Sequence, residues 1–389
     1  MILISGAIYS QSEWTLSNSG VPIGYSPNDF AVASNGDVYV ACSKWETSSF
    51  VPKLLKSTDN GANWTEIIMT GIDNLQNTNS IVFSGSKLLL SGSNSTNGTY
   101  FIYSSVDNGL NWTLSNSGVP TGYSPNDFAA ASNGDVYVAC SKWETSSFVP
   151  KLLKSTDNGT NWTEITMNGV DNLQNTNSIV FSGSKLLLSG SNSTSGTYFI
   201  YSSVDNGLNW TLSNSGVPTG YSPNDFTVAS NGDVYVACSK WETSSFVPKL
   251  LKSTDNGTNW TEITMNGVDN LQNTNSIAET GNKLVISGSN STTGSYYIYS
   301  SSLPSAIINI NEQNNIMISP NPVRNILAIE SNSQIIDGIT ITDITGKEII
   351  KYNGDFKNKE IDLSFLHPNL YFVIIQQSNK FIISKIIKQ

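Results

Sequence analysis

Internal repetition dominates this sequence. Residues 14–111 and 112–209 are two copies of one 98-residue unit that differ at seven positions, and a third copy runs from Trp210 to about Ser301. Each copy divides into two related halves, and each half contains four short strand-like runs separated by turns. Four strands per repeat, arranged radially, predict an all-β fold built as a β-propeller.

The number of blades follows from the expected strands. Each copy predicts eight strands, which in the first copy span 29–34, 37–44, 51–58, 64–69, 80–84, 87–92, 100–106 and 112–115. The last half-repeat has runs only at 277–280, 283–288 and 296–301, whereas the N-terminal run 14–17 is a fourth strand without a blade. We therefore expect six blades over residues 12–302, with the N-terminal strand closing the last blade and removing an exposed edge.

The pattern Ser-x-Asp-x-Gly-x-x-Trp marks five of the half-repeats. It resembles the Asp-box, or BNR repeat, of sialidase-like propellers, and the resemblance implies a hairpin between the third and fourth strands of a blade. The Gly can adopt a positive φ, Ser and Asp can accept turn N–H groups, and Trp can cover the hairpin base. We expect a structural role for these residues: Ser57, Asp59, Gly61, Trp64, Ser105, Asp107, Gly109, Trp112, Ser155, Asp157, Gly159, Trp162, Ser203, Asp205, Gly207, Trp210, Ser253, Asp255, Gly257 and Trp260.

Two absences restrict the chemistry of the propeller. The only histidine is His367 and the only arginine is Arg324, so residues 1–302 contain neither. This excludes Ser-His-Asp sets and histidine metal sites there. It also excludes the arginine grip on a carboxylate that a sialidase resemblance would imply. We expect no cofactor, no metal and no catalytic residues, and a carboxylate-dependent glycoside hydrolase remains an alternative. Its candidate acids are Asp29, Asp37, Glu46, Glu66, Asp73 and their repeat equivalents.

Loop lengths point to one face of the ring. The segments 17–27, 43–50, 71–79 and 91–99 are expected to be long loops that emerge together. Aromatic and acidic residues recur in them, and such rings can stack on sugars while polar groups bond hydroxyls. The alternative is that each Trp only packs over its own loop. The candidate ligand-binding residues are Trp45, Trp143, Trp241, Tyr25, Tyr123, Tyr221, Glu46, Glu144 and Glu242.

The cysteines and the N-terminus carry less information. Cys42, Cys140 and Cys238 each lie in the sequence GDVYVACSK, which is typical of a buried strand position and not of a disulfide framework. Residues 1–11 resemble the back half of a signal peptide, with a degenerate strand as the alternative. No apolar run is long enough to predict a membrane span.

The C-terminal residues differ in composition from the repeats. After a linker at 303–315, residues 316–389 predict seven short strands and hence a small β-sandwich. The segments Ser319-Pro-Asn-Pro322, 339–347, 361–366, 370–373 and 383–388 resemble the type A C-terminal sorting domain of the Bacteroidetes type IX secretion system. Asn369 stands where that family usually has Gly, and Asn also tolerates left-handed turns. The motif residues are Pro320, Asn321, Pro322, Asp343, Gly346, Lys347, Tyr371 and Lys385.

These observations give an expected function. The sorting-domain resemblance implies export through the periplasm to the cell surface or the medium, with the type IX machinery as a partner. We expect a monomeric, non-catalytic binding protein whose ligand is a neutral glycan or a surface protein. The net charge of −10 argues against nucleic acid and anionic glycans. A surface adhesin with a protein partner remains the main alternative.

Overall fold

The computed structural model describes residues 13–303, 316–331, 335–343, 347–377 and 380–388. The regular secondary structure of these residues consists entirely of β-strands. The chain divides into two compact units, Met1–Leu303 and Pro304–Gln389, and each is described by itself. The expected signal-peptide remnant and all but the first residue of the expected linker lie outside the described residues.

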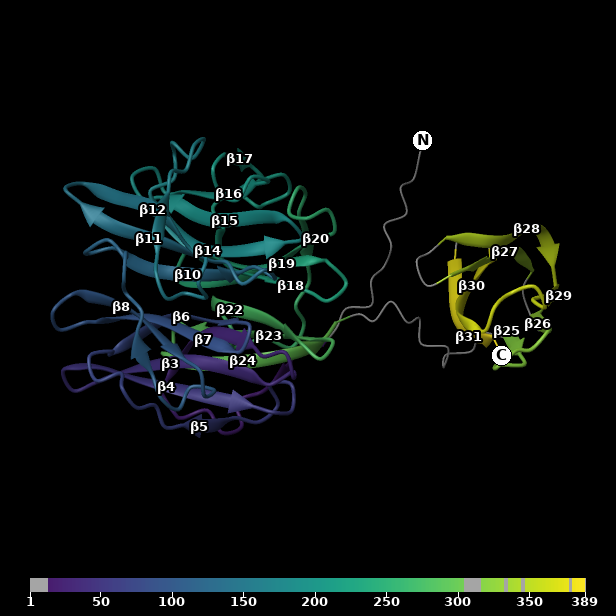
Figure 1. The fold of residues 1–389 in the computed structure, drawn as a ribbon, viewed down its shortest axis with the longest axis horizontal. Coiled ribbons are helices and arrows are strands. Elements are labelled where there is room, and N and C mark those ends of the chain that lie inside the picture. Colours follow the sequence, from purple (N-terminus) through teal and green to yellow (C-terminus); the bar gives the residue numbers. More distant parts are fainter. Residues whose placement is uncertain (1–12, 304–315, 332–334, 344–346, 378–379, 389) are drawn as a thin grey trace. The chain divides into compact units, whose positions relative to one another are not determined.

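The described part of the first unit forms six four-stranded antiparallel sheets, numbered here as blades 1 to 6 in chain order (Figure 1). Blade 1 contains β2 (Ser26–Val32), β3 (Val38–Glu46), β4 (Ser49–Ser57) and β5 (Thr65–Ile67); blade 2 contains β6 (Asn77–Ser84), β7 (Lys87–Asn94), β8 (Thr99–Ser105) and β9 (Thr113–Leu114). Blade 3 contains β10 (Ser124–Ala130), β11 (Val136–Glu144), β12 (Ser147–Ser155) and β13 (Thr163–Ile165); blade 4 contains β14 (Asn175–Ser182), β15 (Lys185–Asn192), β16 (Thr197–Ser203) and β17 (Thr211–Leu212). Blade 5 contains β18 (Ser222–Val228), β19 (Val234–Glu242), β20 (Ser245–Ser253) and β21 (Thr261–Ile263).

Blade 6 closes the ring as the sequence predicted. Its strands β22 (Asn273–Thr280), β23 (Lys283–Asn290) and β24 (Ser295–Ser302) are completed by β1 (Thr15–Leu16), in the sheet order β1-β24-β23-β22. Thr15 pairs with Ser300, and Leu16 pairs with Tyr299. The innermost strand β22 contacts β2 of blade 1, and green strands of the last blade lie beside purple strands of the first in Figure 1. The fold is therefore a six-bladed propeller.

The core of the propeller lies between the blades. In β3, Val38, Val40 and Cys42 pack with blade 6, whereas Tyr39 and Ala41 pack with blade 2. Alternate strand residues point to opposite faces of a sheet, so a blade with neighbours on both sides must be apolar on both faces. One cluster of buried residues fills each of the six blade interfaces.

The expectation of a long loop at residues 43–50 is wrong, because this segment is a β-hairpin. Strands β3 and β4 stay paired out to Glu46 and Ser49, and Thr47 takes a positive φ of 44° in the tight turn between them. The segment 91–99 is likewise mostly strand, since β7 ends at Asn94 and β8 begins at Thr99. Polar Ser and Thr residues suggested loops, but cross-strand pairing extends the ladder through them.

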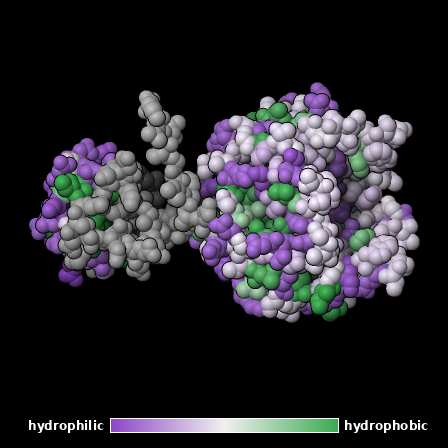
Figure 2. Space-filling model, turned by 180° about the vertical axis from the view of Figure 1, so that it is seen from behind, coloured by the Kyte–Doolittle hydropathy of each residue, from purple (hydrophilic) through white to green (hydrophobic). Residues whose placement is uncertain are grey.

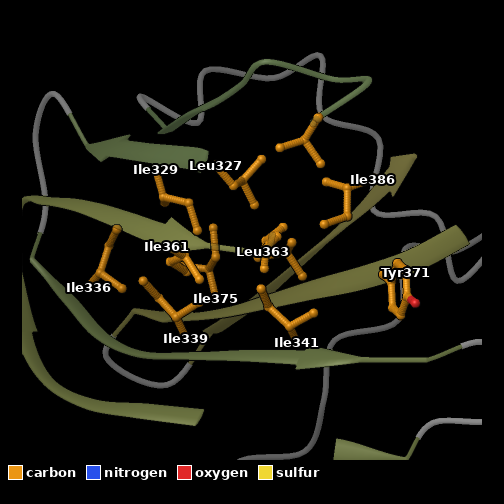
Figure 3. Packing of buried hydrophobic residues seen from close by; sticks show 12 residues of the cluster. Leu327, Ile329, Ile336, Ile339, Ile341, Ile361, Leu363, Tyr371, Ile375 and Ile386 are labelled. Carbon is orange, nitrogen blue, oxygen red and sulfur yellow. The ribbon is translucent and has the colours of Figure 1, made fainter. Parts of the chain in front are cut away.

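The second unit is a small two-sheet structure, in agreement with the expected β-sandwich. One sheet has the order β25-β26-β29 and the other β28-β27-β30-β31. Its strands are β25 (Ile316–Ser319), β26 (Ile326–Ser331), β27 (Ile336–Thr342), β28 (Glu348–Phe356), β29 (Asn358–Asp362), β30 (Asn369–Gln377) and β31 (Lys380–Lys388). Fully buried residues from both sheets, such as Leu327, Ile341 and Ile375, meet between them in an apolar core (Figure 3).

Candidate functional site

Three equivalent hairpins carry exposed tryptophans. Trp45 lies near the end of β3, directly opposite Phe50 of β4, and 56% of its surface is exposed. The two rings meet edge to face, with centroids 5.0 Å apart. The same pair recurs as Trp143–Phe148 and Trp241–Phe246. We call the β3–β4, β11–β12 and β19–β20 hairpins the tryptophan hairpins.

The acidic residues beside these tryptophans point away from them. Glu46 forms an ion pair of 3.3 Å with Lys44, and the Lys44 ammonium lies over the Tyr25 ring. Lys44 and Glu46 occupy the even positions of β3, which face blade 6, whereas Trp45 occupies an odd position on the side that faces blade 2. This arrangement does not support the expectation that Glu46 assists a sugar stacked on Trp45, and the same holds for Glu144 and Glu242.

The candidate tyrosines are also not available for stacking. Tyr25, Tyr123 and Tyr221 are only 5–6% exposed. Two lysine ammonium groups, from Lys44 and Lys53, lie within 6 Å of the Tyr25 ring centre. Burial raises the pKa of the Tyr25 hydroxyl, opposed by Lys53 and reinforced by Glu46. Their position in the connecting segment predicted exposure, but cation–π contacts and the apolar interface draw the rings inward.

The Asp-box residues form the turn that the resemblance implied. The Ser57 hydroxyl accepts the Gly61 N–H at 2.9 Å and donates to Asp59 Oδ1 at 2.7 Å. Asp59 in turn accepts the backbone N–H and the side-chain amide of Asn63. Gly61 has a φ of 81°. The Trp64 indole N–H donates to the carbonyl of Ser17, in the segment that leads from β1 to blade 1. The box thus fastens its hairpin to the neighbouring connection.

Hydrogen bonding explains the acidity of the Asp-box carboxyls. The Asn63 side chain and backbone N–H, followed by Ser57, lower the pKa of Asp59 to about 2. Equivalent bonds lower the pKa of Asp107, Asp205 and Asp255 to about 2 as well. A carboxyl held ionised by turn amides is suited to structure and not to proton transfer near neutral pH.

A ring of buried polar side chains lies on the propeller axis. Asp29, Asp127 and Asp225 come from the innermost strands of blades 1, 3 and 5, and Ser80, Ser178 and Ser276 from those of blades 2, 4 and 6. Each serine hydroxyl bridges two aspartates, at 2.6–2.9 Å, so that the six residues form a closed circle. We call this circle the axial ring.

Asp29 is among the candidate acids expected from the sequence, whereas the ring as a whole was not predicted. The available signal was an Asp or Ser recurring at the fourth position of the first strand of every half-repeat, where an apolar residue would be usual. Burial, followed by the charges of Asp225 and Asp127, raises the pKa of Asp29 well above its ordinary value. Burial and the Asp225 charge raise the pKa of Asp127 to about 7, and burial raises that of Asp225.

A cavity of about 400 Å³ lies on the axis. It is lined by the three ring aspartates and, in each of the six innermost strands, by the three residues that follow the ring residue. Its lining departs from three-fold repetition at several positions, and only one of these departures introduces a charged residue. Phe83 of blade 2 and Phe181 of blade 4 correspond to Glu279 in blade 6, whose carboxylate accepts the Ser230 hydroxyl at 3.3 Å. Glu279 is thus the asymmetric acid that the near-identity of the repeats had concealed.

Two of the remaining candidate acids, Asp37 and Glu66, have ordinary structural partners. Asp37 pairs with Lys56 at 2.6 Å, and Glu66 forms an ion pair with Lys53. Within the described residues, no group of His, Cys, Asp and Glu is arranged to hold a metal ion. The three cysteines are free and buried in strands. No helix in the described part of the chain is long and apolar enough to span a membrane.

The surface around the propeller blades is mixed in polarity. Figure 2 shows small hydrophobic patches on one face of the propeller, separated by hydrophilic and neutral residues. Exposed apolar side chains recur with the repeats, including Leu16, Leu114 and Leu212 on the outermost strands. The tryptophan hairpins are distinguished from these by a large aromatic ring held by a second ring.

The sorting motif residues hold the C-terminal strand and its turns. The Asn321 side-chain amide donates to the Lys385 carbonyl at 2.8 Å, and its oxygen accepts the Ile387 N–H at 2.9 Å. Pro320 and Pro322 flank Asn321 with cis peptide bonds. Asp343 and Lys347 close a turn through their backbones and the Asp343 carboxylate; Gly346 lies outside the described residues. The Tyr371 hydroxyl donates to the backbone carbonyl of His367 at 3.0 Å.

Comparisons with known proteins agree with both halves of this description. Residues 317–389 match the family described as secretion system C-terminal sorting domain. A comparison with curated proteins finds no match. Among solved structures, a Hadza microbial sialidase is similar at 13% identity and a TM-score of 0.55, covering 73% of this chain and 66% of that one.

Two further structures resemble the chain at similar distance. A Dyadobacter fermentans protein of unknown function has 14% identity and a TM-score of 0.55, covering 75% of this chain and 98% of that one. A putative gluconolactonase has 12% identity and a TM-score of 0.51, covering 75% and 94%. Such likeness shows the fold alone. The chain thus contains a six-bladed β-propeller, followed at residues 317–389 by a secretion system C-terminal sorting domain, which indicates export to the cell surface or the extracellular medium.

Proposed function

We propose that this protein is a non-catalytic binding protein of the cell surface or medium, which holds neutral glycans on its three tryptophan hairpins. The observation that carries the proposal is the repeated pair of an exposed Trp and an edge-on Phe. Each Trp is 56–58% exposed. Exposed indoles supply a flat apolar surface that suits the C–H face of a sugar ring.

The charge distribution favours an uncharged ligand. The protein carries a net charge of −10, and each hairpin neutralises its own Lys–Glu pair on the side opposite the Trp. Three sites on one rigid ring would bind a polymer more tightly than one site does, because the second and third contacts are intramolecular. Weak individual sites would then suffice for retention on a polysaccharide.

Retention on immobilised polysaccharides tests the proposal. The variant with Trp45→Ala, Trp143→Ala and Trp241→Ala should lose retention while its circular dichroism and unfolding midpoint stay near those of the natural protein. The matched control replaces Leu16, Leu114 and Leu212 by Ala, because these three side chains are as exposed, at 58–59%, and equally repeated. The control should be retained like the natural protein.

The same panel separates the other function classes. Equal retention of the Trp variant and the natural protein would overturn the proposal. Release of reducing sugar, lost in Glu279→Gln, would instead favour a hydrolase. Absence of any glycan retention, together with Trp-dependent capture of one surface protein, would favour an adhesin.

A further inference from the structure

When its three aspartates are ionised, the axial ring has fewer hydroxyl hydrogens than it has contacts between serine and carboxyl oxygens. Each serine hydroxyl lies within hydrogen-bond distance of two carboxyl oxygens, which makes six contacts. A hydroxyl carries one hydrogen and an ionised carboxylate carries none. With all three aspartates ionised, three of the six contacts would therefore place two oxygen lone pairs together without a hydrogen between them.

Backbone N–H groups donate mainly to the carboxyl oxygens and replace the missing hydrogens only in part. The Ile81 N–H donates to Asp29 Oδ2 at 2.7 Å, and the equivalent amides of Ile179 and Ile277 donate to Asp127 and Asp225. The Phe30 N–H donates to Asp29 Oδ1 at 2.8 Å and lies 3.3 Å from the Ser276 hydroxyl oxygen, and the Phe226 N–H is shared in the same way by Asp225 and Ser178. These shared N–H groups ease two of the six contacts. A proton on each carboxyl would complete the circle, because each carboxyl would then donate to one serine and accept from the other.

Among the described residues that line the axial cavity, no positive charge replaces those protons. The elements packed around it are β2, β6, β10, β14, β18 and β22, and the only charged residue that these strands contain besides the ring aspartates is Glu279, which lines the same cavity. Among the described residues that line the cavity, none is Lys, Arg or His. Three buried carboxylates without a counter-charge are costly, and neutralisation by protons removes that cost.

We propose that the axial ring binds protons at neutral pH and acts as a pH-responsive clasp that fastens all six blades at the axis. The ring is complete in acidic and neutral solution, where its hydroxyls and carboxyls alternate as donors and acceptors. It loosens in alkaline solution, where the lost protons leave charge and lone-pair contacts between neighbouring blades.

The direction of the pH effect follows from linkage. The pKa values of Asp29, Asp127 and Asp225 are raised in the folded protein, with Asp127 at about 7. A raised folded-state pKa gives stability that is fully present below the unfolded value near 4 and is lost as pH rises through the folded value. Residues 1–302 contain no histidine, the side chain that ordinarily titrates in this window.

Infrared spectroscopy of the full chain tests for the protons directly. At pH 6 the folded natural protein should show the C=O band of protonated carboxyl groups, and the band should fade as pH rises towards 9. Asp127→Asn and Asp29→Asn should each weaken this band. The control Asp59→Asn, which removes an Asp-box carboxyl held ionised, should leave it unchanged. A folded natural protein without the band at pH 6, or a band unaffected by both ring variants, would overturn the proposal.

Unfolding provides a second measurement that needs no variant. Between pH 6 and 8 the unfolding equilibrium constant should rise by up to tenfold per pH unit for each proton that the folded ring retains. If Asp127→Asn fails to fold, this slope and the band of the natural protein still decide the matter. A constant that stays flat or falls over this range contradicts the clasp.

Discussion

The Phe50 ring meets the Trp45 indole at an interplanar angle of 78°. An edge-on neighbour restricts rotation of the indole about its side-chain bonds while leaving more than half of the Trp surface exposed. A ring that is already held in its binding orientation loses less conformational entropy when a ligand stacks on it. Phe50 is thus expected to act as a positioning residue for the binding surface.

Replacing the three supporting phenylalanines tests this role. Phe50→Leu, Phe148→Leu and Phe246→Leu together should weaken glycan retention less than loss of the tryptophans does. An aromatic pair contributes roughly 0.5–1.5 kcal/mol, so each site should weaken by about 2- to 12-fold. Affinity electrophoresis against a retained polysaccharide measures the change, and Trp fluorescence anisotropy should fall in parallel. Retention equal to that of the natural protein would remove Phe50 from the mechanism.

Loss of an Asp-box serine should destabilise the propeller. Ser57→Ala leaves the buried Gly61 N–H without its acceptor and removes one of the donors to Asp59. An unsatisfied buried donor costs about 1–3 kcal/mol, which urea unfolding would resolve. The neighbouring exposed Thr58→Ala is the control, and its unfolding free energy should change by less than about 0.5 kcal/mol. Equal effects of the two changes would contradict the structural role of the serine.

Acid should destabilise the folded protein by protonating the Asp-box carboxylates. The folded pKa of Asp59 is about 2, below the ordinary value of 3.8, because Asn63 and Ser57 bond its ionised form. A lowered folded pKa gives stability that is present above pH 4 and is lost as pH falls towards 2. Urea midpoints between pH 5 and 2 should therefore fall less steeply in Asp59→Asn. The exposed Asp73→Asn, outside any box, should keep the steep fall of the natural protein.

The six-bladed ring could be predicted from the sequence because several independent repeated features indicate it. The period of the strands, the five Asp-boxes and the orphan strand near Trp14 all required six blades closed by β1. The hairpin at Trp45 was mistaken for a loop because Ser and Thr are common in both, and only the pairing of Glu46 with Ser49 distinguishes them. Local composition does not report cross-strand register.

The site was less accessible to sequence reasoning for two reasons. The opposite orientations of Trp45 and Glu46 follow from alternation only once Trp45 is known to lie in a strand. The bridge from Ser80 to Asp127 spans 47 residues and two blades, and it exists only because the ring brings all first strands to one axis. Such a contact depends on closure of the whole domain and has no local pattern.

The cysteines should be unreactive while the propeller is folded. Cys42 is fully buried in a blade interface, and burial strongly raises the pKa of its thiol. The thiolate is the reactive species, so a thiol-specific reagent should label Cys42, Cys140 and Cys238 only at the rate of unfolding. Mass spectrometry in native buffer and in urea measures this difference. Rapid labelling of one cysteine in native buffer would indicate local opening of its blade interface.

Because β1 closes the ring, loss of the side chain that anchors it should have a local effect on blade 6. Trp14 is buried among residues of blades 5 and 6, and its backbone N–H donates to Asn266 at 2.9 Å. Trp14→Ala should cost about 3–5 kcal/mol, as expected for a large-to-small change in a core. It should also release β1 from β24, because the indole anchors the start of that strand.

Hydrogen exchange distinguishes this opening from general destabilisation. In Trp14→Ala the amides of β24 that pair with β1 should exchange earliest, since only that edge loses its partner. Trp112→Ala makes the same substitution beside β9 and should accelerate exchange in β8 instead. If both variants accelerated exchange uniformly around the propeller, the six blades would open as one cooperative unit. The pairing of β1 with β24 would then not open separately, which would contradict this prediction.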